Sequence, residues 1–115
     1  MISFKKVPGI FLYRQPVDLR KGIDGYAALV SACGLDPCSG QLFLFTNRSE
    51  NKMKGIIYDG VSFWLLYRRL NSGKIQWKRQ GEDTIFITHV QLKRLLKGMN
   101  IDYAGNYRPS HPELS

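Results

Sequence analysis

The dipeptide Asp59-Gly60 constrains the fold of this chain more than any other feature. It separates two runs rich in strand-forming residues, 53–58 and 61–70. Asp-Gly between two such runs is a strong short-range signal for a β-hairpin. A two-residue turn would place Tyr58 opposite Val61 and would fix the register of everything that follows.

This predicted register divides the hairpin into two faces, because successive side chains of a strand point in opposite directions. One face is mixed and basic, and it carries Lys52, Lys54, Tyr58, Tyr67 and Arg69. The other face is apolar with a single charge, and it carries Met53, Gly55, Ile57, Trp64, Leu66, Leu70 and Arg68. We therefore predict that the second face, with Trp64, belongs to the core.

Hydrophobic spacing predicts the remaining elements. Apolar residues recur on one side of a helix across 19–33, with Asp18 as its N-cap. Thr88 followed by Gln91 predicts a capping box at the start of a second helix. The run 42–45 is apolar at every position, which is typical of a central strand covered on both faces.

Together these elements predict a single α+β domain over 1–102. Its expected architecture is a mostly antiparallel five- to six-stranded sheet built of hairpins and packed with two α-helices. Further short strands are expected within 7–14, 74–77 and 84–87. The segment 103–115 holds prolines and small polar residues, and we expect it to form a flexible C-terminal tail.

Charge is the second strong feature. The 115-residue chain has a net charge of +8, and eight of its 17 basic residues lie within 48–79, opposed only by Glu50 and Asp59. Aromatic residues stand between these cations. Cations with stacking faces suit a polyanion, nucleic acid first and an anionic membrane surface second. A solvated basic face over an aromatic core is equally compatible with this composition.

Membrane insertion and secretion are not expected. The longest apolar runs fall far short of the roughly 20 residues that a spanning helix needs. No apolar segment follows the lysines near the N-terminus, so no signal peptide is predicted. We expect a cytoplasmic protein with no membrane partner.

Catalytic chemistry is also not expected. A two-metal site needs carboxylates that converge from strands, and no acidic residue lies inside a predicted strand. Cys33 and Cys38 lack the further ligands of a zinc site, and a disulfide is poorly motivated in a reducing compartment. We predict no catalytic residue, no metal and no cofactor, and hence a protein that is not an enzyme.

The segments 18–25 and 36–45 carry a family resemblance. Together with later positions they make the chain resemble the TnpB accessory proteins of IS-66 type insertion sequences, the Orf-two-like transposon protein family. The likeness covers residues 7–101 and continues at Asn47, Arg48, Lys54, Tyr58-Asp59-Gly60, Arg69-Leu70, Gly73, Trp77 and 95–98. The chain departs from the family pattern at Cys38, Tyr58 and Lys78.

The resemblance implies a non-catalytic accessory protein for transposition of a bacterial insertion sequence. In such systems a separate transposase holds the catalytic carboxylates, so DNA and the transposase are the implied partners. A DNA-bound protein of this kind would be associated with the nucleoid. The motif positions that carry over are Arg20, Lys21, Asp24, Arg48, Lys54, Asp59, Arg69 and Trp77.

Two hypotheses for function follow, and the oligomeric state is left open by both. In the first the protein binds DNA at element ends or target sites, with Trp77 or Tyr67 stacking on a base. The candidate DNA-binding residues are Arg20, Lys21, Arg48, Lys52, Lys54, Arg68, Arg69, Lys74, Trp77, Lys78 and Arg79. In the second the protein is an adaptor that docks on the transposase, through an exposed sheet edge or through Asp18, Asp24 and Tyr26. A small hydrolase is a weaker third reading.

Overall fold

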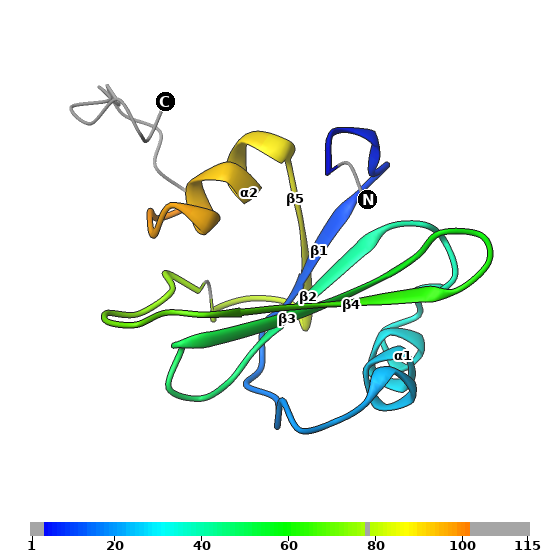
Figure 1. Cartoon of the computed structure of the whole chain (residues 1–115), viewed down its shortest axis with the longest axis horizontal. Helices are drawn as coiled ribbons and strands as arrows, with labels where there is room; N and C mark the ends of the chain where they lie inside the picture. Colours follow the sequence, from blue (N-terminus) through cyan, green and yellow to red (C-terminus); the bar gives the residue numbers. More distant parts are fainter. Residues whose placement is uncertain (1–3, 78, 102–115) are drawn as a thin grey trace.

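A computed structural model describes residues 4–77 and 79–101 of the protein. It contains a five-stranded sheet in the order β4-β3-β2-β1-β5, together with two α-helices (Figure 1). The elements are η1 (Phe4–Lys6), β1 (Ile10–Tyr13), α1 (Ile23–Ala32), β2 (Leu42–Thr46), β3 (Lys52–Tyr58), β4 (Phe63–Arg69), β5 (Thr84–Ile87) and α2 (His89–Leu96). Of the neighbouring strand pairs, β1 and β2 run parallel and the others run antiparallel. The predicted mostly antiparallel α+β fold is confirmed.

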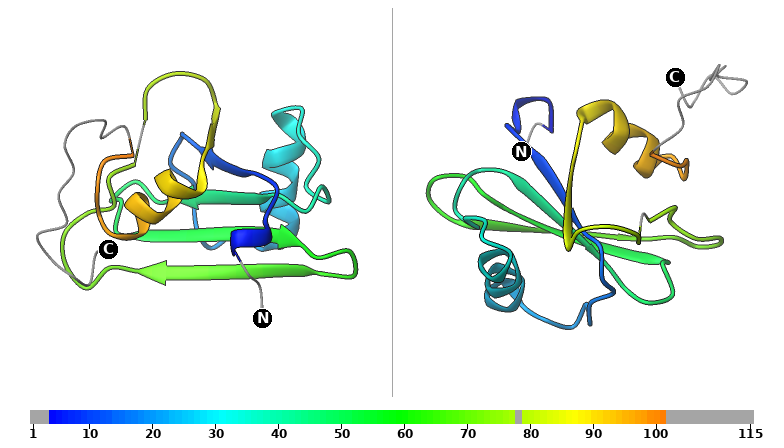
Figure 2. Two further views of the ribbon diagram at one scale, coloured as in Figure 1. Left: turned by 90° about the horizontal axis from the view of Figure 1, so that it is seen from above. Right: turned by 180° about the vertical axis from the view of Figure 1, so that it is seen from behind.

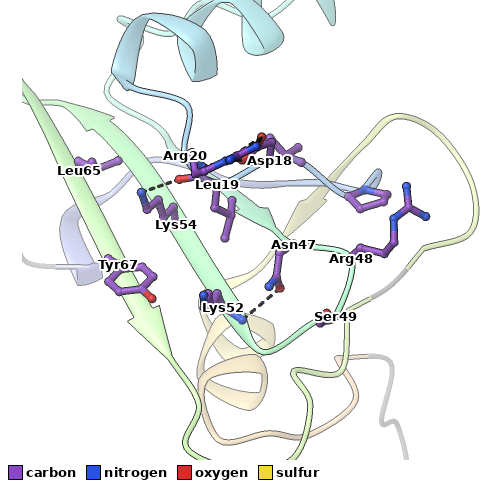
Figure 3. A pocket seen from close by; sticks show the side chains of 12 residues that line it. Asp18, Leu19, Arg20, Asn47, Arg48, Ser49, Lys52, Lys54, Leu65 and Tyr67 are labelled. Atoms are coloured by element: carbon purple, nitrogen blue, oxygen red, sulfur yellow. Dashed lines mark hydrogen bonds and ion pairs between the residues drawn. The ribbon is translucent and has the colours of Figure 1, made fainter.

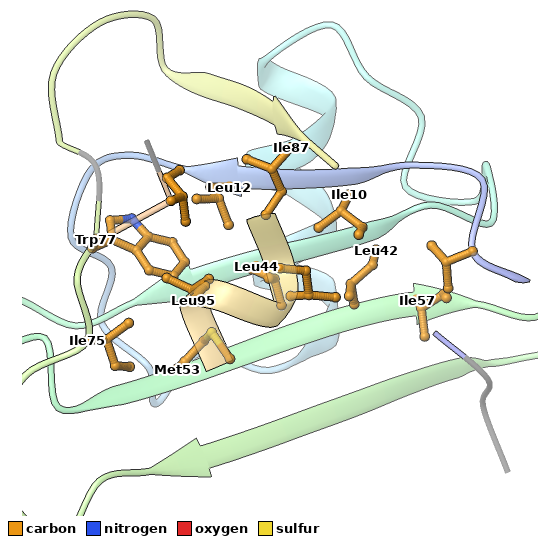
Figure 4. Packing of buried hydrophobic residues seen from close by; sticks show 13 residues of the cluster. Ile10, Leu12, Leu42, Leu44, Met53, Ile57, Ile75, Trp77, Ile87 and Leu95 are labelled. Carbon is orange, nitrogen blue, oxygen red and sulfur yellow. The ribbon is translucent and has the colours of Figure 1, made fainter. Parts of the chain in front are cut away.

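The two helices cover opposite faces of the sheet (Figures 1 and 2). Strand β2 is third in the sheet and all five of its residues are buried, so the prediction of a doubly covered central strand is confirmed. Phe43 and Phe45 pack on the side of α1. Leu42 and Leu44 pack on the side of α2, in the cluster drawn in Figure 4. This alternation places the core on both sides of one sheet.

The hairpin forms, but its turn is longer than predicted. Tyr58 pairs with Phe63, so four residues, 59–62, connect β3 to β4. The Asp59 carboxylate explains the longer loop, because its Oδ1 accepts hydrogen bonds from the backbone N–H groups of Val61 and Ser62, both at 2.8 Å. The register therefore shifts by two residues relative to a two-residue turn. A shift of two leaves every side chain on its predicted face.

The placement of Trp64 in the core is wrong. Its side chain is 43% exposed, and its indole Nε1 donates to Asp59 Oδ2 at 2.8 Å. The physical reason is position, because β4 is an edge strand and one of its sides has no neighbouring strand among the described residues. The predicted face is right for Trp64, but at this point that face is open to solvent.

The first helix begins later than predicted. Asp18 does not cap it, because α1 starts at Ile23 with Gly22 as the N-cap residue. Asp18 instead accepts a hydrogen bond from the backbone N–H of Arg20 at 3.0 Å and stabilises a turn before the helix. The capping box of α2 is confirmed, with both the Thr88 and the Gln91 side chains engaged.

Two further expectations concern the C-terminal half. No strand forms over the described residues of 74–77, although Ile75 and Trp77 are buried there. The tail predicted at 103–115 lies outside the residues that the structure describes. Neither α-helix in the described ranges has the length and apolar character needed to cross a membrane.

Candidate nucleic-acid interface

A basic pocket of about 770 Å³ opens on the α1 side of the β3–β4 hairpin (Figure 3). It lies between the segment that leads into α1, the loop after β2, and strands β3 and β4. Its lining residues are Pro16, Val17, Asp18, Leu19, Arg20, Asn47, Arg48, Ser49, Lys52, Lys54, Leu65 and Tyr67. We call this site the basic pocket.

The first wall, segment 16–20, is held against the sheet by its apolar residues and its backbone. Val17 and Leu19 are buried, and the Val17 N–H donates to the Thr46 carbonyl at 2.9 Å. The Leu19 carbonyl accepts two hydrogen bonds, from the Tyr26 hydroxyl at 2.9 Å and from Lys54 Nζ at 2.6 Å. Alternation along this segment therefore leaves Asp18 and Arg20 at the exposed rim.

The second wall is the loop 47–51 between β2 and β3. The Asn47 side chain organises it, because its Oδ1 accepts from the N–H groups of Asn51 and Lys52, both at 3.2 Å. Its Nδ2 donates to Asn51 Oδ1 at 2.7 Å. Arg48 and Ser49 are exposed beyond this closed ring of bonds. The loop thus presents Arg48 on a fixed backbone rather than on a loose one.

The pocket carries four basic side chains against one carboxylate, and that carboxylate is already engaged. Asp18 Oδ2 lies 2.7 Å from Arg20 Nη2. Hydrogen bonds from the Arg20 side chain, and then from its backbone N–H, hold the pKa of the Asp18 carboxyl well below its usual value. Arg20 Nη1 takes no part in these bonds. Among the described residues, neither Arg48 nor Lys52 has an ion pair.

Lys52 also faces a second cation across the hairpin. It is the cross-strand partner of Arg69, so two positive charges stand directly opposite each other on the basic face. Like charges in this position repel and destabilise a sheet. Next to them, Lys54 Nζ lies 5.5 Å from the centroid of the Tyr67 ring, whose residue is 56% exposed. The arrangement provides an uncompensated positive field beside an accessible aromatic ring.

The structure brings only part of the predicted DNA-binding set together. Arg20, Arg48, Lys52 and Lys54 line the basic pocket. Arg69 does not line it, but it lies on the same face of the hairpin as Lys52 and Lys54. Arg68 lies on the other face, where it lines an apolar groove beside α2. Two further candidates, Lys21 and Lys74, are exposed but do not line the pocket. Lys78 lies outside the described residues.

Trp77 and Arg79 perform structural roles that leave them little freedom for a ligand. Trp77 is 6% exposed, packs in the α2-side core (Figure 4) and donates from Nε1 to the Tyr13 carbonyl at 3.0 Å. Its ring therefore has no free face for a base. Arg79 donates to the carbonyls of Arg14 and Asn47, and its Nε lies 3.5 Å from Glu50 Oε2. Burial lowers the pKa of Arg79, although an arginine stays charged at neutral pH.

The three candidate partner-docking residues differ in their exposure to solvent. Asp18 and Asp24 are exposed. Tyr26 is fully buried, and its ring stacks on Phe45 with centroids 4.8 Å apart. Its hydroxyl is occupied by the Leu19 carbonyl, and burial raises the pKa of Tyr26. Tyr26 therefore supports the pocket from beneath and offers no surface to a partner.

Sequence reasoning missed the residues that shape the pocket without carrying charge. In the sequence, Asn47 is only one position of the family motif. No sequence signal indicates that the Leu19 carbonyl accepts two hydrogen bonds. A second feature was missed entirely, an apolar groove of about 480 Å³ that Leu66, Arg68, Leu92 and Leu96 help to line on the α2 side. In residues 4–77 and 79–101 no group of His, Cys, Asp and Glu is arranged to hold a metal ion.

Comparisons with known proteins identify one family and two similar sequences. A family model described as IS66 Orf2 like protein matches residues 8–105. Two similar proteins come from Sinorhizobium fredii (strain NBRC 101917 / NGR234), where each is named only as an uncharacterized protein. Protein y4jC is 30% identical over 92 residues, which is 79% of this chain and 79% of its own length. Protein y4hO is 34% identical over 84 residues, which is 72% of this chain and 73% of its own. No solved structure gives a significant match.

Proposed function

This chain belongs to the IS66 Orf2-like family, and from that premise we propose that it is a non-catalytic accessory protein that binds DNA during transposition. It assists a separate transposase by engaging element ends or target DNA. The observation that carries the proposal is the gathering of Arg20, Arg48, Lys52 and Lys54 around one open pocket. Three separate segments of the chain supply these cations, so their convergence is a property of the fold.

The chemistry of the pocket suits a sugar-phosphate backbone. Phosphates are bound mainly by Arg and Lys side chains, which displace condensed counterions as they do so. Arg48 and Lys52 supply charge that no carboxylate of the described residues neutralises. Tyr67 forms the opposite wall with an exposed ring, which is the platform that an unpaired base stacks on. The pocket therefore fits a strand whose phosphates lie on the cations and whose bases reach Tyr67.

Fluorescence anisotropy with labelled oligonucleotides tests this proposal. The probes are duplex and single-stranded DNA of the element-end sequence and of scrambled sequence, titrated at several salt concentrations. Log affinity should fall linearly with log salt, and each phosphate contact contributes about 0.7–0.9 to the slope. The double variant Lys52→Gln/Arg69→Gln should lower that slope by about 1.4–1.8 units.

A matched control removes the same charge from the other side of the sheet. Arg68→Gln/Lys93→Gln changes Arg68 beside the apolar groove and exposed Lys93 on α2. It should leave the salt slope within experimental error of the unmodified protein. Undetectable binding at low salt would refute the proposal. Equal losses in the two double variants would also refute it, because they would show a non-localised charge effect.

An adaptor that docks on the transposase is the second candidate, and the apolar groove beside α2 favours it. Leu66, Leu92 and Leu96 help to line this groove with little polar surface, and such grooves are common protein-binding sites. Co-purification with the transposase in the presence of nuclease and salt would support the adaptor. Substituting Leu96→Glu should then abolish the complex and leave DNA binding by the basic pocket unchanged.

A further inference from the structure

The outer edge of β4 is exposed and self-complementary, and we propose that two copies of this chain pair along it to form a dimer with one continuous sheet. This proposal does not depend on DNA binding. Among the described residues no strand pairs with this edge. Unpaired edges of this kind are templates for adding another strand.

The register of the hairpin identifies which backbone groups are available. The Leu70 N–H donates to the Asn51 carbonyl at 2.9 Å, and the Asp59 N–H donates to the Ser62 carbonyl at 3.1 Å. Ser62 and Leu70 therefore direct their backbone groups toward β3. Because this direction alternates along a strand and the β3–β4 pairing is unbroken, the intervening odd-numbered residues direct theirs outward. These outward residues are Phe63, Leu65, Tyr67 and Arg69.

Apolar side chains accompany these free backbone groups. Leu65 is 41% exposed, and Trp64 and Tyr67 are exposed to a similar or greater extent. The other edge strand, β5, is shorter, and its exposed Phe86 already contacts the Phe11 ring at a centroid distance of 5.3 Å. Edges are normally protected by charge, proline or short length. Strand β4 has seven residues and no proline, and its two charges, Arg68 and Arg69, stand together at one end. The edge therefore has the character of an interface.

Antiparallel self-pairing centred on Leu66 uses the full length of β4. It places Phe63 opposite Arg69 of the second copy, and Leu65 opposite Tyr67 of the second copy. All four outward residues then lie in hydrogen-bonded pairs, each of which exchanges two backbone bonds. No cation faces a cation in this register. Trp64 meets Arg68 of the second copy, and an arginine over an aromatic ring is attractive.

The two-fold axis of such a dimer is perpendicular to the sheet, so equivalent faces of the two copies point the same way. Both basic pockets would open on one side of the joined sheet. Leu65 and Tyr67 line each pocket and also belong to the pairing edge, so the two pockets would flank the interface. The dimer would present its cations as one tract rather than as two separate sites.

Sedimentation equilibrium of the full chain without DNA tests the proposal first. A dimer has twice the 13.2 kDa mass of the monomer. Leu65→Pro removes an outward N–H that β3 does not use, so the variant should fold and be monomeric. Leu65→Val keeps this N–H and should remain dimeric. Circular dichroism of both variants verifies that the proline is tolerated.

Cysteine cross-linking tests the register, in a background with Cys33→Ser and Cys38→Ser. Leu66→Cys brings two thiols together at the two-fold axis, so oxidation should give a covalent dimer. Arg68→Cys is the control, because its copies would lie about 13 Å apart, beyond the roughly 7 Å that a disulfide spans. A chain that is monomeric at every concentration overturns the proposal, as does equal cross-linking at the two positions. In that case the edge is free for a strand of another protein.

Discussion

Lys54 gives the sharpest test of how the basic pocket is built, because its charge serves the fold as well as the surface. The substitution Lys54→Met keeps most of the apolar stem and removes the ammonium group. In the native chain that ammonium donates to the Leu19 carbonyl at 2.6 Å and so fastens segment 16–20 to β3. Losing it should loosen one wall of the pocket and lower the free energy of unfolding.

The magnitude follows from the two contacts of Lys54 Nζ. A hydrogen bond from a charged donor is worth about 1.5–3 kcal/mol. The position over the Tyr67 ring adds about 0.5–1 kcal/mol at an exposed site. Lys54 is half-buried, so water screens part of both contributions. We expect Lys54→Met to cost about 2 kcal/mol, which is a fall of roughly 10 °C in the melting midpoint.

Urea unfolding followed by circular dichroism measures this cost, and Lys52→Met is its matched control. Lys52 lies two residues away on the same strand and face, but its side chain makes no hydrogen bond with another described residue and faces Arg69. Its replacement should be neutral or slightly stabilising. A cost below about 0.5 kcal/mol for Lys54→Met, or equal costs for the two variants, would refute the reasoning.

A double-mutant cycle with Tyr26→Phe locates the effect at the Leu19 carbonyl. The Tyr26 hydroxyl is the other donor to this oxygen, at 2.9 Å. Either single variant leaves the carbonyl with one donor, whereas the double variant leaves a buried acceptor with none. The double variant should therefore cost about 1 kcal/mol more than the two singles combined. Additive costs would place the effect of Lys54 elsewhere.

Three further predictions follow from local contacts. Hydrogen bonds from the Ser62 N–H, the Trp64 indole and the Val61 N–H lower the pKa of Asp59. These bonds therefore stabilise the folded protein above about pH 4, and this stabilisation is lost as the pH falls through the lowered pKa. The fluorescence of Trp64 should change in that acid range, and Asp59→Asn should abolish the change. Thr88→Ala removes the capping box of α2 and should lower the free energy of unfolding by about 1 kcal/mol in urea titrations. Burial raises the pKa of Cys33, whereas Cys38 is exposed, so Cys38 should react first with a thiol reagent.

The faces of the hairpin could be predicted from sequence even though its turn could not. Asp59-Gly60 suggested a two-residue connection, but the Asp59 carboxylate binds the N–H groups of Val61 and Ser62 and extends the loop to 59–62. The same residue type favours both arrangements, so local sequence does not decide between them. The error amounts to two residues, one full period of side-chain alternation, and it therefore cancels.

The two tryptophans show that local sequence patterns alone do not predict which residues are buried. Trp64 was predicted in the core and is exposed, whereas Trp77 was a candidate for stacking on a DNA base and is buried. Alternation gives the face of a residue, but burial depends on what covers that face. Trp64 lies on an edge strand, and Trp77 reaches the α2-side core from a segment with no regular secondary structure. Both outcomes depend on the order of strands in the sheet, which neither segment encodes alone.

The sequence indicates which basic residues could form the pocket, but it does not indicate that they meet at one site. Lys52, Lys54 and Arg69 follow from alternation along the hairpin. Every second residue of a strand and its cross-strand partner lie on the same face, and Lys52 is paired with Arg69. Arg20 and Arg48 come from two other segments, and nothing in the spacing of these residues indicates that they meet. Their convergence requires the buried Val17 and Leu19 to anchor the segment before α1. Anchors of this kind are ordinary apolar residues in the sequence.

Under the proposed function, the opposed cations Lys52 and Arg69 serve an anion at the edge of the basic pocket at a cost in stability. Two cations opposite each other cost up to about 1 kcal/mol, and a single neutral residue would remove that cost. A bound anion would turn this destabilising contribution into a stabilising one, because it relieves the repulsion between the two cations and forms contacts with both. Binding and folding are then linked through the same two charges. Lys52→Gln should therefore make the free protein more stable and bind DNA more weakly, whereas a merely solvated face would gain stability with no loss of affinity.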